Sequence, residues 1–521
     1  MTRREFINRT SVVSSGSGYV AMLALGMVQS APSQAFNLPR TDKSNKKIII
    51  LGAGLAGMTA AYELGKLGYD CTLLEARNRA GGRVWTLRGG TTETEIGGQK
   101  QTCRFDEGHY LNAGAARIPH HHQLTIQYCR ELKIPLEIFG NFNEAGYYYA
   151  ENQGGNLANQ RVRAREIHAD MRGYTCELLA KAIDQHSLDL PMTKEDVDKL
   201  LTWLKEEGDL NEQKLYKGSE RHGYKVRPAA GTQAGELASA HQLKDIIESG
   251  LTHPAFANVG EYTYHQQPIM LQPVGGMDKL PQAFANLLGD KIRYECEIQA
   301  IRKKQSGVLI EYRDKKTGKT KDITADYCIC TLPLSILKNI ESDLSGDVKR
   351  TADFVSYMDA CKIGIQFKRR FWEEDDAIFG GITKTNMDIT QLFYPSYGFL
   401  GQKGVVKGMY NFHERARRVG NLSLADREKL ALEQGGKIHP QYVTEFENSF
   451  SLAWQKIPYS RGAWATYTSA QRQRLYSTLL EPDGEIYFAG EHCSYLTAWM
   501  AGAFESARYV VDKLHQRVVK G

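Results

Sequence analysis

The sequence has none of the closely spaced cysteine pairs that mark a metal cluster or a disulfide framework. Nine cysteines are scattered through 521 residues, and no two of them form a Cys-x-x-Cys pair. We therefore expect most of them to be buried free thiols. His120, His121 and His122 are consecutive, but no further metal ligand stands at a recognised spacing from them. We expect a surface loop or a helix start at this point, and no metal site.

Internal repeats and a strong excess of charge are absent too. The first 35 residues carry +2 of a net charge of +6, which leaves +4 (6 − 2) for the rest of the chain. So small a charge argues against nucleic acid or an anionic membrane as a partner. A content of 42% hydrophobic and 24% charged residues is that of a globular protein. The length is enough for two or three domains.

The first 35 residues are typical of an export signal. Thr2–Ile7 (TRREFI) resembles a twin-arginine motif, a moderately apolar stretch follows at Val12–Val28, and Ser33 and Ala35 offer a cleavage site. The apolar stretch is short and interrupted by glycine and serine, so stable membrane insertion is not expected. The alternative is a disordered basic terminus. We expect a bacterial protein that is exported to the periplasm or secreted.

Residues 48–75 have the order of a dinucleotide-binding βαβ unit. An apolar run leads into Gly52, Gly54 and Gly57, a helical pattern follows, and a second apolar run ends on Glu75. Gly52 permits a tight turn, Gly54 lets a pyrophosphate approach the backbone, and Gly57 lets the helix pack on the strand. The phosphates would lie at the helix N-terminus. Glu75, 18 residues beyond Gly57 (75 − 57), can accept hydrogen bonds from ribose hydroxyls.

A second glycine turn with two cations follows directly, at Arg79–Arg83 (RAGGR). Its backbone can approach a pyrophosphate while Arg79 and Arg83 neutralise the charge, although a solvated basic turn is the alternative. Here the sequence resembles the FAD-dependent amine oxidase superfamily, in which RxGGR follows the first βαβ unit. The resemblance implies an α/β fold: a Rossmann-like FAD-binding domain, an α+β substrate-binding domain and a helical lobe.

The far end of the chain carries a second part of the same resemblance. Glu485–Gly490 is a strand pattern that leads to Glu491, and a helix starts near Ala498. In the superfamily this carboxylate holds the flavin ribityl chain, and the helix start directs N–H groups at the ring. Ile298 stands where the superfamily uses backbone groups on the adenine. The resemblance thus implies FAD contacts at Gly52, Gly54, Ala56, Gly57, Glu75, Ala76, Arg77, Gly82, Arg83, Gly114, Ala115, Ala116, Arg117, Ile298, Gly490, Glu491, Ala498, Trp499 and Met500.

Pattern changes along the chain suggest that the FAD-binding domain is discontinuous. The segment from about residue 140 to 267 looks mostly like polar helices, which we expect to form a lobe over the substrate entrance. The expected units are a signal peptide (1–35), three parts of the FAD-binding domain (36–118, 268–335 and 481–521), a mainly helical lobe with part of the substrate domain (119–267), and the substrate-binding domain (336–480).

Three residues are expected at the reacting end of the site. Lys362 lies in an otherwise apolar strand pattern, where a lysine is costly unless it is paired, solvated or used. It matches the superfamily lysine that holds a water near flavin N5 and aids the reaction with O2. Asn112–Pro119 resembles the L-amino-acid oxidase segment whose arginine, here Arg117, holds the substrate carboxylate bidentately. By the same match, Tyr394 places a hydroxyl beside that carboxylate.

Two tryptophans match the rings that flank the amine in monoamine oxidases. Trp464 and Trp499 would make a predominantly apolar pocket in which the amino group faces them and the Ala498 backbone. Ala463 stands where monoamine oxidases carry the cysteine linked to the flavin, so FAD is expected to be non-covalent.

The resemblance as a whole implies an FAD-dependent L-amino-acid oxidase. Hydride would pass from Cα to flavin N5, O2 would reoxidise the flavin to give H2O2, and the imino acid would hydrolyse to a 2-oxo acid and ammonia. A homodimer is usual in this family and is expected here. The alternatives are an amine or polyamine oxidase, an amino-acid 2-monooxygenase, an NAD-linked dehydrogenase, and a flavin-bearing interaction protein without turnover.

Overall fold

The computed structural model describes residues 36–185, 192–256 and 264–520. The expected export signal falls within residues 1–35, outside these ranges. In the described ranges, no helix combines the length and the apolar character needed to cross a bilayer. All nine cysteines lie in the described residues, and each is a buried free thiol, as expected.

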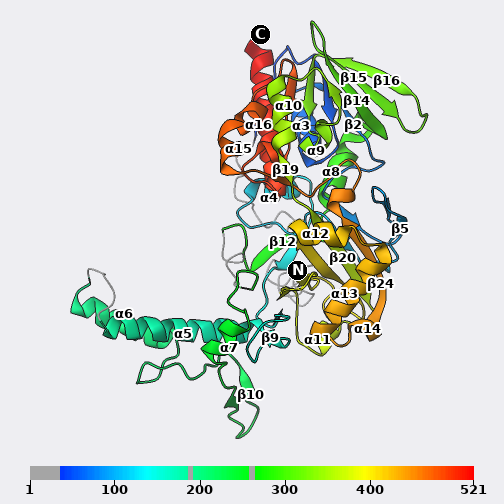
Figure 1. Cartoon of the computed structure of the whole chain (residues 1–521). Helices are drawn as coiled ribbons and strands as arrows, with labels where there is room; N and C mark the ends of the chain where they lie inside the picture. The colour runs from blue at the N-terminus through cyan, green and yellow to red at the C-terminus, as the bar shows by residue number, and fades with distance from the viewer. Residues whose placement is uncertain (1–35, 186–191, 257–263, 521) are drawn as a thin grey trace, which may run out of the picture.

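A five-stranded parallel sheet organises the upper half of the molecule (Figure 1). Its strand order is β13-β2-β1-β17-β26. These strands are nearly continuous apolar runs because helices and a second sheet cover both faces. Their bounds are β1 Lys47–Leu51, β2 Asp70–Glu75, β13 Ile292–Tyr294, β17 Tyr327–Cys330 and β26 Ile486–Phe488. The strands therefore come from the three separate segments that the sequence assigned to the FAD-binding domain.

Helices pack on one face of this sheet and a four-stranded sheet lies at the other. The helices are α3 (Leu55–Lys66), α4 (Gln123–Glu131), α8 (Lys279–Leu288) and α16 (Met500–Lys520), and α3 and α16 contact each other along their lengths. Small residues in α3, such as Ala60 and Ala61, are fully buried and let these elements approach closely. The four-stranded sheet has the order β16-β15-β14-β18, with β14 Cys296–Lys303, β15 Val308–Asp314, β16 Thr320–Ala325 and β18 Glu341–Ser342.

A seven-stranded mixed sheet forms the lower half and belongs to the expected substrate-binding domain (Figure 1). Its order is β24-β20-β23-β22-β21-β8-β9, and β20, between β24 and β23, is buried along all eight residues. The bounds are β8 Tyr147–Tyr149, β9 Arg161–Arg163, β20 Ala360–Phe367, β21 Ile382–Thr385, β22 Gln391–Phe393, β23 Gly404–Phe412 and β24 Phe446–Ala453. The accompanying helices are α11 Phe371–Glu374, α12 His413–Gly420, α13 Leu424–Ile438 and α14 Tyr442–Glu445.

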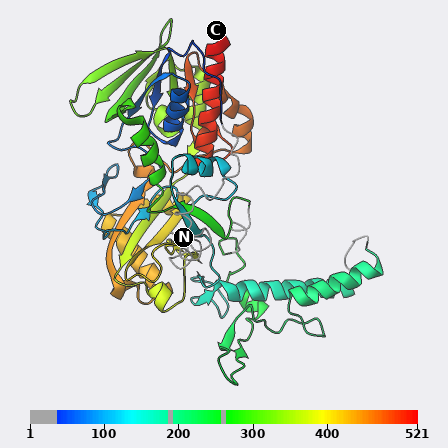
Figure 2. The same ribbon diagram turned by 180° about the vertical axis from the view of Figure 1, so that it is seen from behind.

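The predicted helical lobe is an arm that projects away from the body (Figures 1 and 2). It contains α5 (Ala164–Asp184), α6 (Lys194–Glu207) and α7 (Leu243–Glu248), with a short hairpin of β10 (Tyr224–Val226) and β11 (Glu236–Leu237). The expectation of mostly helix over the substrate entrance is therefore wrong for α5 and α6. Helices α5 and α6 pack against each other, and among the described residues that follow α5 in the lobe, Pro254, Ala255 and Gln266 line the cavity described below.

Short elements complete the described chain and connect its two halves. They are β3 Thr86–Leu87, β4 Thr92–Thr94, β5 Lys100–Thr102, β6 Leu111–Asn112, β7 Leu136–Gly140, β12 Ile269–Pro273, α9 Leu334–Leu337, α10 Gly346–Phe354, β19 Ser356–Tyr357, β25 Ala465–Thr466 and α15 Ser469–Arg474. Strand β7 pairs with β12 between the two large sheets.

Candidate active site

A cavity of about 930 Å³ lies between the carboxyl ends of the parallel strands and the seven-stranded sheet. This is the edge at which open α/β sheets bind ligands. Of the residues singled out in the sequence for the site, all but Gly57, Arg79 and Tyr394 line this one cavity. Segments more than 400 residues apart therefore share a site, as the matching motifs at the two ends of the chain predict.

The first glycine turn has the geometry that its three positions require. Gly52 has a φ of +100°, which favours glycine, and a Cβ added to Gly57 would lie 2.1 Å from the Gly52 carbonyl oxygen. A Cβ added to Gly54 would meet no atom within 4 Å, so the backbone there faces open space. Gly57 thus acts through helix-to-strand packing and not through contact with the cavity. Gly54 leaves room for a phosphate beside the helix N-terminus of α3.

Glu75 at the end of β2 is held by backbone N–H groups. Its Oε2 accepts a hydrogen bond from Ala53 N and its Oε1 accepts one from Arg77 N, both at 2.9 Å. The carboxylate lines the cavity and keeps further acceptor capacity for ribose hydroxyls. Arg77 lines the cavity beside it and donates to Ser460 Oγ at 2.8 Å, which fixes its guanidinium.

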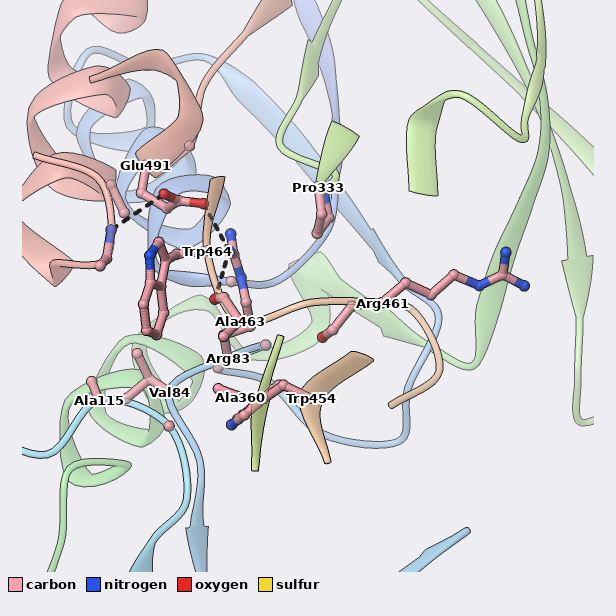
Figure 3. A pocket seen from close by; sticks show the side chains of 18 of the residues that line it. Arg83, Val84, Ala115, Pro333, Ala360, Trp454, Arg461, Ala463, Trp464 and Glu491 are labelled. Carbon is pink, nitrogen blue, oxygen red and sulfur yellow. Dashed lines mark hydrogen bonds and ion pairs between the residues drawn. The ribbon is translucent and has the colours of Figure 1, made fainter. Parts of the chain in front are cut away.

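Arg83 and Glu491 join the two ends of the chain across the cavity wall (Figure 3). Arg83 Nη1 donates to Glu491 Oε1 at 2.7 Å and to the Ala463 carbonyl oxygen at 3.1 Å. Glu491 also accepts from the backbone N–H of Ala465 at 3.2 Å and of Ala498 at 3.4 Å. The carboxylate is thus oriented from three segments, as a group that must hold one position on a cofactor would be.

Arg79 does not share the role that the sequence assigned to it. It donates to the Gly82 carbonyl oxygen at 3.0 Å, its guanidinium lies 4.0 Å from the centre of the Trp85 ring, and it does not line the cavity. Only one of the two arginines in the RAGGR turn therefore faces the cavity. Gly81 and Gly82, both with positive φ, lie between the two arginines. The chain reverses direction at these glycines, between the two guanidinium groups.

Ile298 reaches the cavity where β14 carries a bulge. The pairing with β15 shifts between Ile298 and Ala300, which leaves Gln299 as an extra residue. A bulge releases backbone N–H and C=O groups from the ladder. Glu297, Ile298 and Gln299 all line the cavity, so free backbone groups are available for an adenine edge, as the family resemblance implies.

Gly114 lies where two backbone segments touch. A Cβ added to it would lie 1.7 Å from the Arg83 carbonyl oxygen, and that oxygen belongs to the backbone. We expect Gly114→Ala to push Arg83 and its turn out of place and to remove most of the bound flavin. The measurement is the ratio of flavin to protein absorbance, with circular dichroism confirming a folded chain. Gly65→Ala is the matched control, since a Cβ there meets nothing within 4 Å, and its flavin content should not change. Full flavin content in Gly114→Ala would contradict the expectation.

Arg117 lies at the other end of the cavity with a ring beneath it. Its Nη2 donates to Gln266 Oε1 at 3.1 Å and its guanidinium carbon lies 5.4 Å from the centre of the Phe393 ring. The amide and the ring hold the guanidinium at the wall of the cavity.

Lys362 is 2% exposed in the middle of β20. Its Nζ donates to the Gly114 carbonyl oxygen at 2.6 Å and lies 4.3 Å from the centre of the Tyr410 ring. Burial first, and then the charges of Lys407 and Arg117, hold the pKa of Lys362 well below its usual range. The lowered pKa favours the neutral amine, which can accept a proton or hold a water molecule.

Lys407 in β23 is a second buried lysine, on the strand next to that of Lys362. Its Nζ lies 4.2 Å from the Phe393 ring centre, and burial, followed by the charge of Arg117, lowers its pKa from 10.5 to about 7. Below pH 7 both the folded and the unfolded chain carry the proton, and the folded state bears the full penalty of a buried charge. Between pH 7 and 10.5 only the unfolded chain binds the proton, so stability rises with pH.

We expect Lys407→Met to stabilise the fold by about 2–5 kcal/mol at pH 6 and by less than about 1 kcal/mol at pH 10. The gain shrinks because the native lysine is already neutral at high pH and its penalty has gone. Denaturant unfolding at the two pH values measures it. Lys349→Met, at an exposed position, should show the same small effect at both. A gain that is equal at pH 6 and pH 10 would contradict the role of the Lys407 charge.

Tyr394 is not beside the carboxylate site, and this prediction is corrected. Its side chain is 1% exposed, and its hydroxyl lies 2.8 Å from Thr383 Oγ1 and 2.6 Å from His439 Nε2, in the core behind the sheet. Successive residues of a strand point to opposite faces. Phe393 therefore faces Arg117, and the next residue, Tyr394, faces away.

Trp464 and Trp499 both line the cavity, from segments on either side of Glu491. Trp464 packs edge-on against Phe412, with ring centres 5.7 Å apart, and Trp499 packs against His122 at 5.0 Å. Ala498, between Glu491 and Trp499, has a φ of +68°, which aims its backbone N–H at the Glu491 carboxylate. That the two rings enclose an amine stays a prediction.

Several lining residues escaped the sequence reasoning. Asn141 is 1% exposed, and both polar atoms of its side-chain amide have no hydrogen-bond partner among the described residues. Ile382 and Lys384 alternate along β21 and both reach the cavity, a period of two that the sequence does show. Further lining residues that the sequence did not indicate include Thr390, Gln391, Tyr410, Phe412, Trp454 and Tyr459.

A dinucleotide-binding sheet and a large mixed sheet share one cavity, and Arg117 and the buried Lys362 line its far end. This arrangement defines a flavin-dependent oxidoreductase. Residues 55–515 match the family model of the flavin-containing amine oxidoreductases. The chain belongs to this family, and its cofactor is a flavin. The residues present fit such a group, since Gly54 leaves open space at the helix start and Glu75, Arg83 and Glu491 stand around it.

Relatives with assigned names cover nearly the whole chain. The flavin-dependent L-tryptophan oxidase RebO of Lentzea aerocolonigenes is 28% identical over 497 residues, 89% of this chain and 97% of its own length. An L-amino-acid oxidase of Siganus canaliculatus is 27% identical over 499 residues, 92% of this chain and 87% of its own length. The identities are modest, but the lengths correspond.

Solved structures show the same fold. A putrescine oxidase bound to putrescine superposes with a TM-score of 0.60 at 18% identity, covering 92% of this chain and 100% of that one. The cyclohexylamine oxidase of Brevibacterium oxydans IH-35A also superposes with a TM-score of 0.60, at 15% identity over 91% of this chain and 100% of that one. These likenesses confirm the expected α/β amine oxidase architecture.

Proposed function

We propose that this protein is an FAD-dependent L-amino-acid oxidase with non-covalent FAD. The observation that carries the proposal is that Arg117 lines the flavin cavity, where the Gln266 amide and the Phe393 ring hold its guanidinium in place. A primary amine offers no anion to such a group, whereas an amino acid brings a carboxylate to it. Ala463, in the place of a flavin-linking cysteine, supports non-covalent attachment.

The residues of the chain divide the work between the two ends of the cavity. Gly52–Ala56, Glu75, Arg83 and Glu491 hold the cofactor, and a bound flavin supplies the two-electron acceptor for the Cα–H bond. Arg117 fixes the α-carboxylate, which orients Cα with respect to that acceptor. The acids that line the cavity, Glu75, Glu297 and Glu491, all lie at the cofactor end.

Lys362 is the proton-handling group of the proposed site. Because burial lowers its pKa, its neutral form can hold a water molecule and pass a proton in the step with O2. The overall reaction consumes an L-amino acid, O2 and water, and releases a 2-oxo acid, ammonium and H2O2. The rings of Trp464, Trp499, Tyr410 and Phe412 favour apolar or aromatic side chains on the substrate.

Peroxide release tests the proposal directly. Flavin-loaded protein is assayed with the twenty L-amino acids, their D-enantiomers, and the decarboxylated amine of each substrate that reacts. We expect peroxide and equimolar ammonium from L-amino acids, and at least about 100-fold lower kcat/KM for the matching amines. Peroxide from amines alone would assign an amine oxidase, and an amide product without peroxide would assign a 2-monooxygenase.

A further inference from the structure

A second cluster of chemically active side chains lies in the lobe, outside the flavin cavity. Glu166, His222 and His241 each offer one ligand atom, and these three atoms lie within 4.8 Å of one another. Glu166 is in the first turn of α5, His222 precedes β10, and His241 precedes α7. None of the three lines the flavin cavity. Distant parts of the lobe thus converge on one point.

Asp170 orients the cluster from behind. It is 0% exposed and lies one turn after Glu166 on α5. Its Oδ1 is 2.9 Å from His222 Nδ1 and accepts from the Tyr216 hydroxyl at 2.7 Å, while its Oδ2 accepts from the backbone N–H of His241 at 2.8 Å. With Nδ1 engaged, the nitrogen that His222 has left to offer is Nε2. A carboxylate on the far nitrogen of a histidine is the usual support of a metal-ligating imidazole.

The cluster also holds a stretch of chain that has little else to hold it. Residues 208–242 contain only the two short strands β10 and β11. The outer lobe has a core of six buried residues, of which this stretch supplies Leu210 and Tyr216. Long connections with so small a core need another source of order, and a bound metal is a common one in small folding units. Asp170, Glu166 and Glu177 of α5 hydrogen-bond to residues 208–242, and the Lys214–Asp184 ion pair and the Tyr174 hydroxyl on the His241 carbonyl oxygen add to these contacts.

We propose that Glu166, His222 and His241 bind one divalent transition-metal ion, and that this ion fastens residues 208–242 onto α5. Two imidazoles and one carboxylate are a ligand set of zinc, whose fourth position is then open to water. The side chains of Glu166 and His241 are 27% and 24% exposed, so an ion and a water can reach the site. In the absence of an ion, His241 Nε2 lies 2.9 Å from Glu166 Oε2.

Another histidine group serves as an internal comparison. His121, His122 and His265 also converge, with His265 Nδ1 2.9 Å from His121 Nε2 and 3.2 Å from His122 Nε2. No carboxylate orients these rings in the described structure, and His121 Nδ1 is instead paired with the Gln267 amide. This group lies beside Trp499, at the flavin cavity. A metal held there would be lost from different variants.

Metal analysis of the full-length, flavin-loaded protein tests the proposal. The protein is incubated with zinc, passed through a desalting column, and analysed by elemental mass spectrometry. We expect about one zinc ion per chain in the wild type, in His253→Gln and in His121→Gln, and at most about one tenth of that in His222→Gln and His241→Gln. His253 is an exposed histidine of the same lobe and is the matched control. A wild type without zinc, ligand variants that keep it, or loss in His121→Gln would overturn the proposal.

Two measurements on the wild type alone guard against misfolded variants. X-ray absorption at the zinc edge should show nitrogen and oxygen neighbours at about 2.0–2.1 Å with imidazole beyond them, and sulfur at about 2.3 Å would overturn the assignment. Chelation should open residues 208–242 to limited proteolysis while flavin absorbance stays constant. An unchanged cleavage pattern after complete zinc removal would overturn the fastening role.

Discussion

Arg117→Ala should lower kcat/KM for L-amino acids by about 10²–10⁴-fold and leave turnover of the matching amines within about threefold. The guanidinium can donate two charge-assisted hydrogen bonds to one carboxylate, and each contributes about 1.5–3 kcal/mol. An amine has no carboxylate, so it has nothing to lose. Steady-state peroxide assays on paired substrates, such as an L-amino acid and its decarboxylation product, measure the difference.

Two further variants make the Arg117 result specific. Arg117→Lys keeps the charge but loses the planar pair of donors, and should recover only part of the loss. Arg104→Ala removes an exposed arginine and should be silent. Flavin absorbance must be followed in each variant, because Arg117 lines the same cavity as the cofactor groups. An equal loss with amino acids and amines, at unchanged flavin content, would remove the basis for assigning amino acids as substrates.

Lys362→Met should slow aerobic turnover by about 10²–10³-fold, a typical effect of removing one proton-handling group. The amine is buried, its pKa is lowered by that burial and by the charges of Lys407 and Arg117, and it is hydrogen-bonded to the Gly114 carbonyl at the wall of the flavin cavity. Methionine fills a similar volume and cannot hold a water or move a proton. Stopped-flow absorbance separates the step with the amino acid, followed anaerobically, from the step with O2.

We expect the loss from Lys362→Met to fall mainly on the step with O2. Lys362→Arg, which carries a charge that cannot be removed at neutral pH, should also fail to restore the rate. Lys349→Met is the control for the loss of a lysine, because Lys349 is exposed and does not line the cavity. A normal rate of reaction with O2 in Lys362→Met would show that the lysine has only a structural role.

The cofactor end of the site was predictable because the local backbone conformation requires its residues. Gly52 and Gly54 are required by a turn and by open space, and Glu75 ends the second strand at a fixed distance from them. Such demands act within about 30 residues of chain, so the order of residues is enough to show them. The contact of Arg83 with Glu491 joins residues 408 positions apart. The sequence placed both residues at one site only because both motifs resemble one family.

The substrate end was less predictable, because it depends on which face of a strand a residue occupies. Tyr394 was placed one residue wrong, since Phe393 carries the ring that faces Arg117. Lys407 went unnoticed although β23 pairs with the strand of Lys362, and so did Lys384 on β21 of the same sheet. Strand order and register decide these neighbours, and both are set by pairing across the sheet and not by position in the chain.

The two histidine groups also depend on long-range contacts that the order of residues does not show. The sequence offered His120, His121 and His122 together, yet His265, from more than 140 residues away, is what makes them a group. The arrangement of Glu166, His222 and His241 had no signal in their spacing, because loops of arbitrary length bring them to one helix.

By itself, the sequence determined the nucleotide-binding turn and the flavin family, and it predicts a discontinuous first domain and an arginine at the substrate end. Each of these follows from residue types at short, constrained spacings or from motifs shared along most of the chain. Only the tertiary structure decided that Tyr394 faces the core, that the lobe projects as an arm, that burial and neighbouring cations lower the pKa of Lys362, and which histidines meet. Burial, register and the proximity of charges arise when distant segments pack, and the order of residues does not contain them.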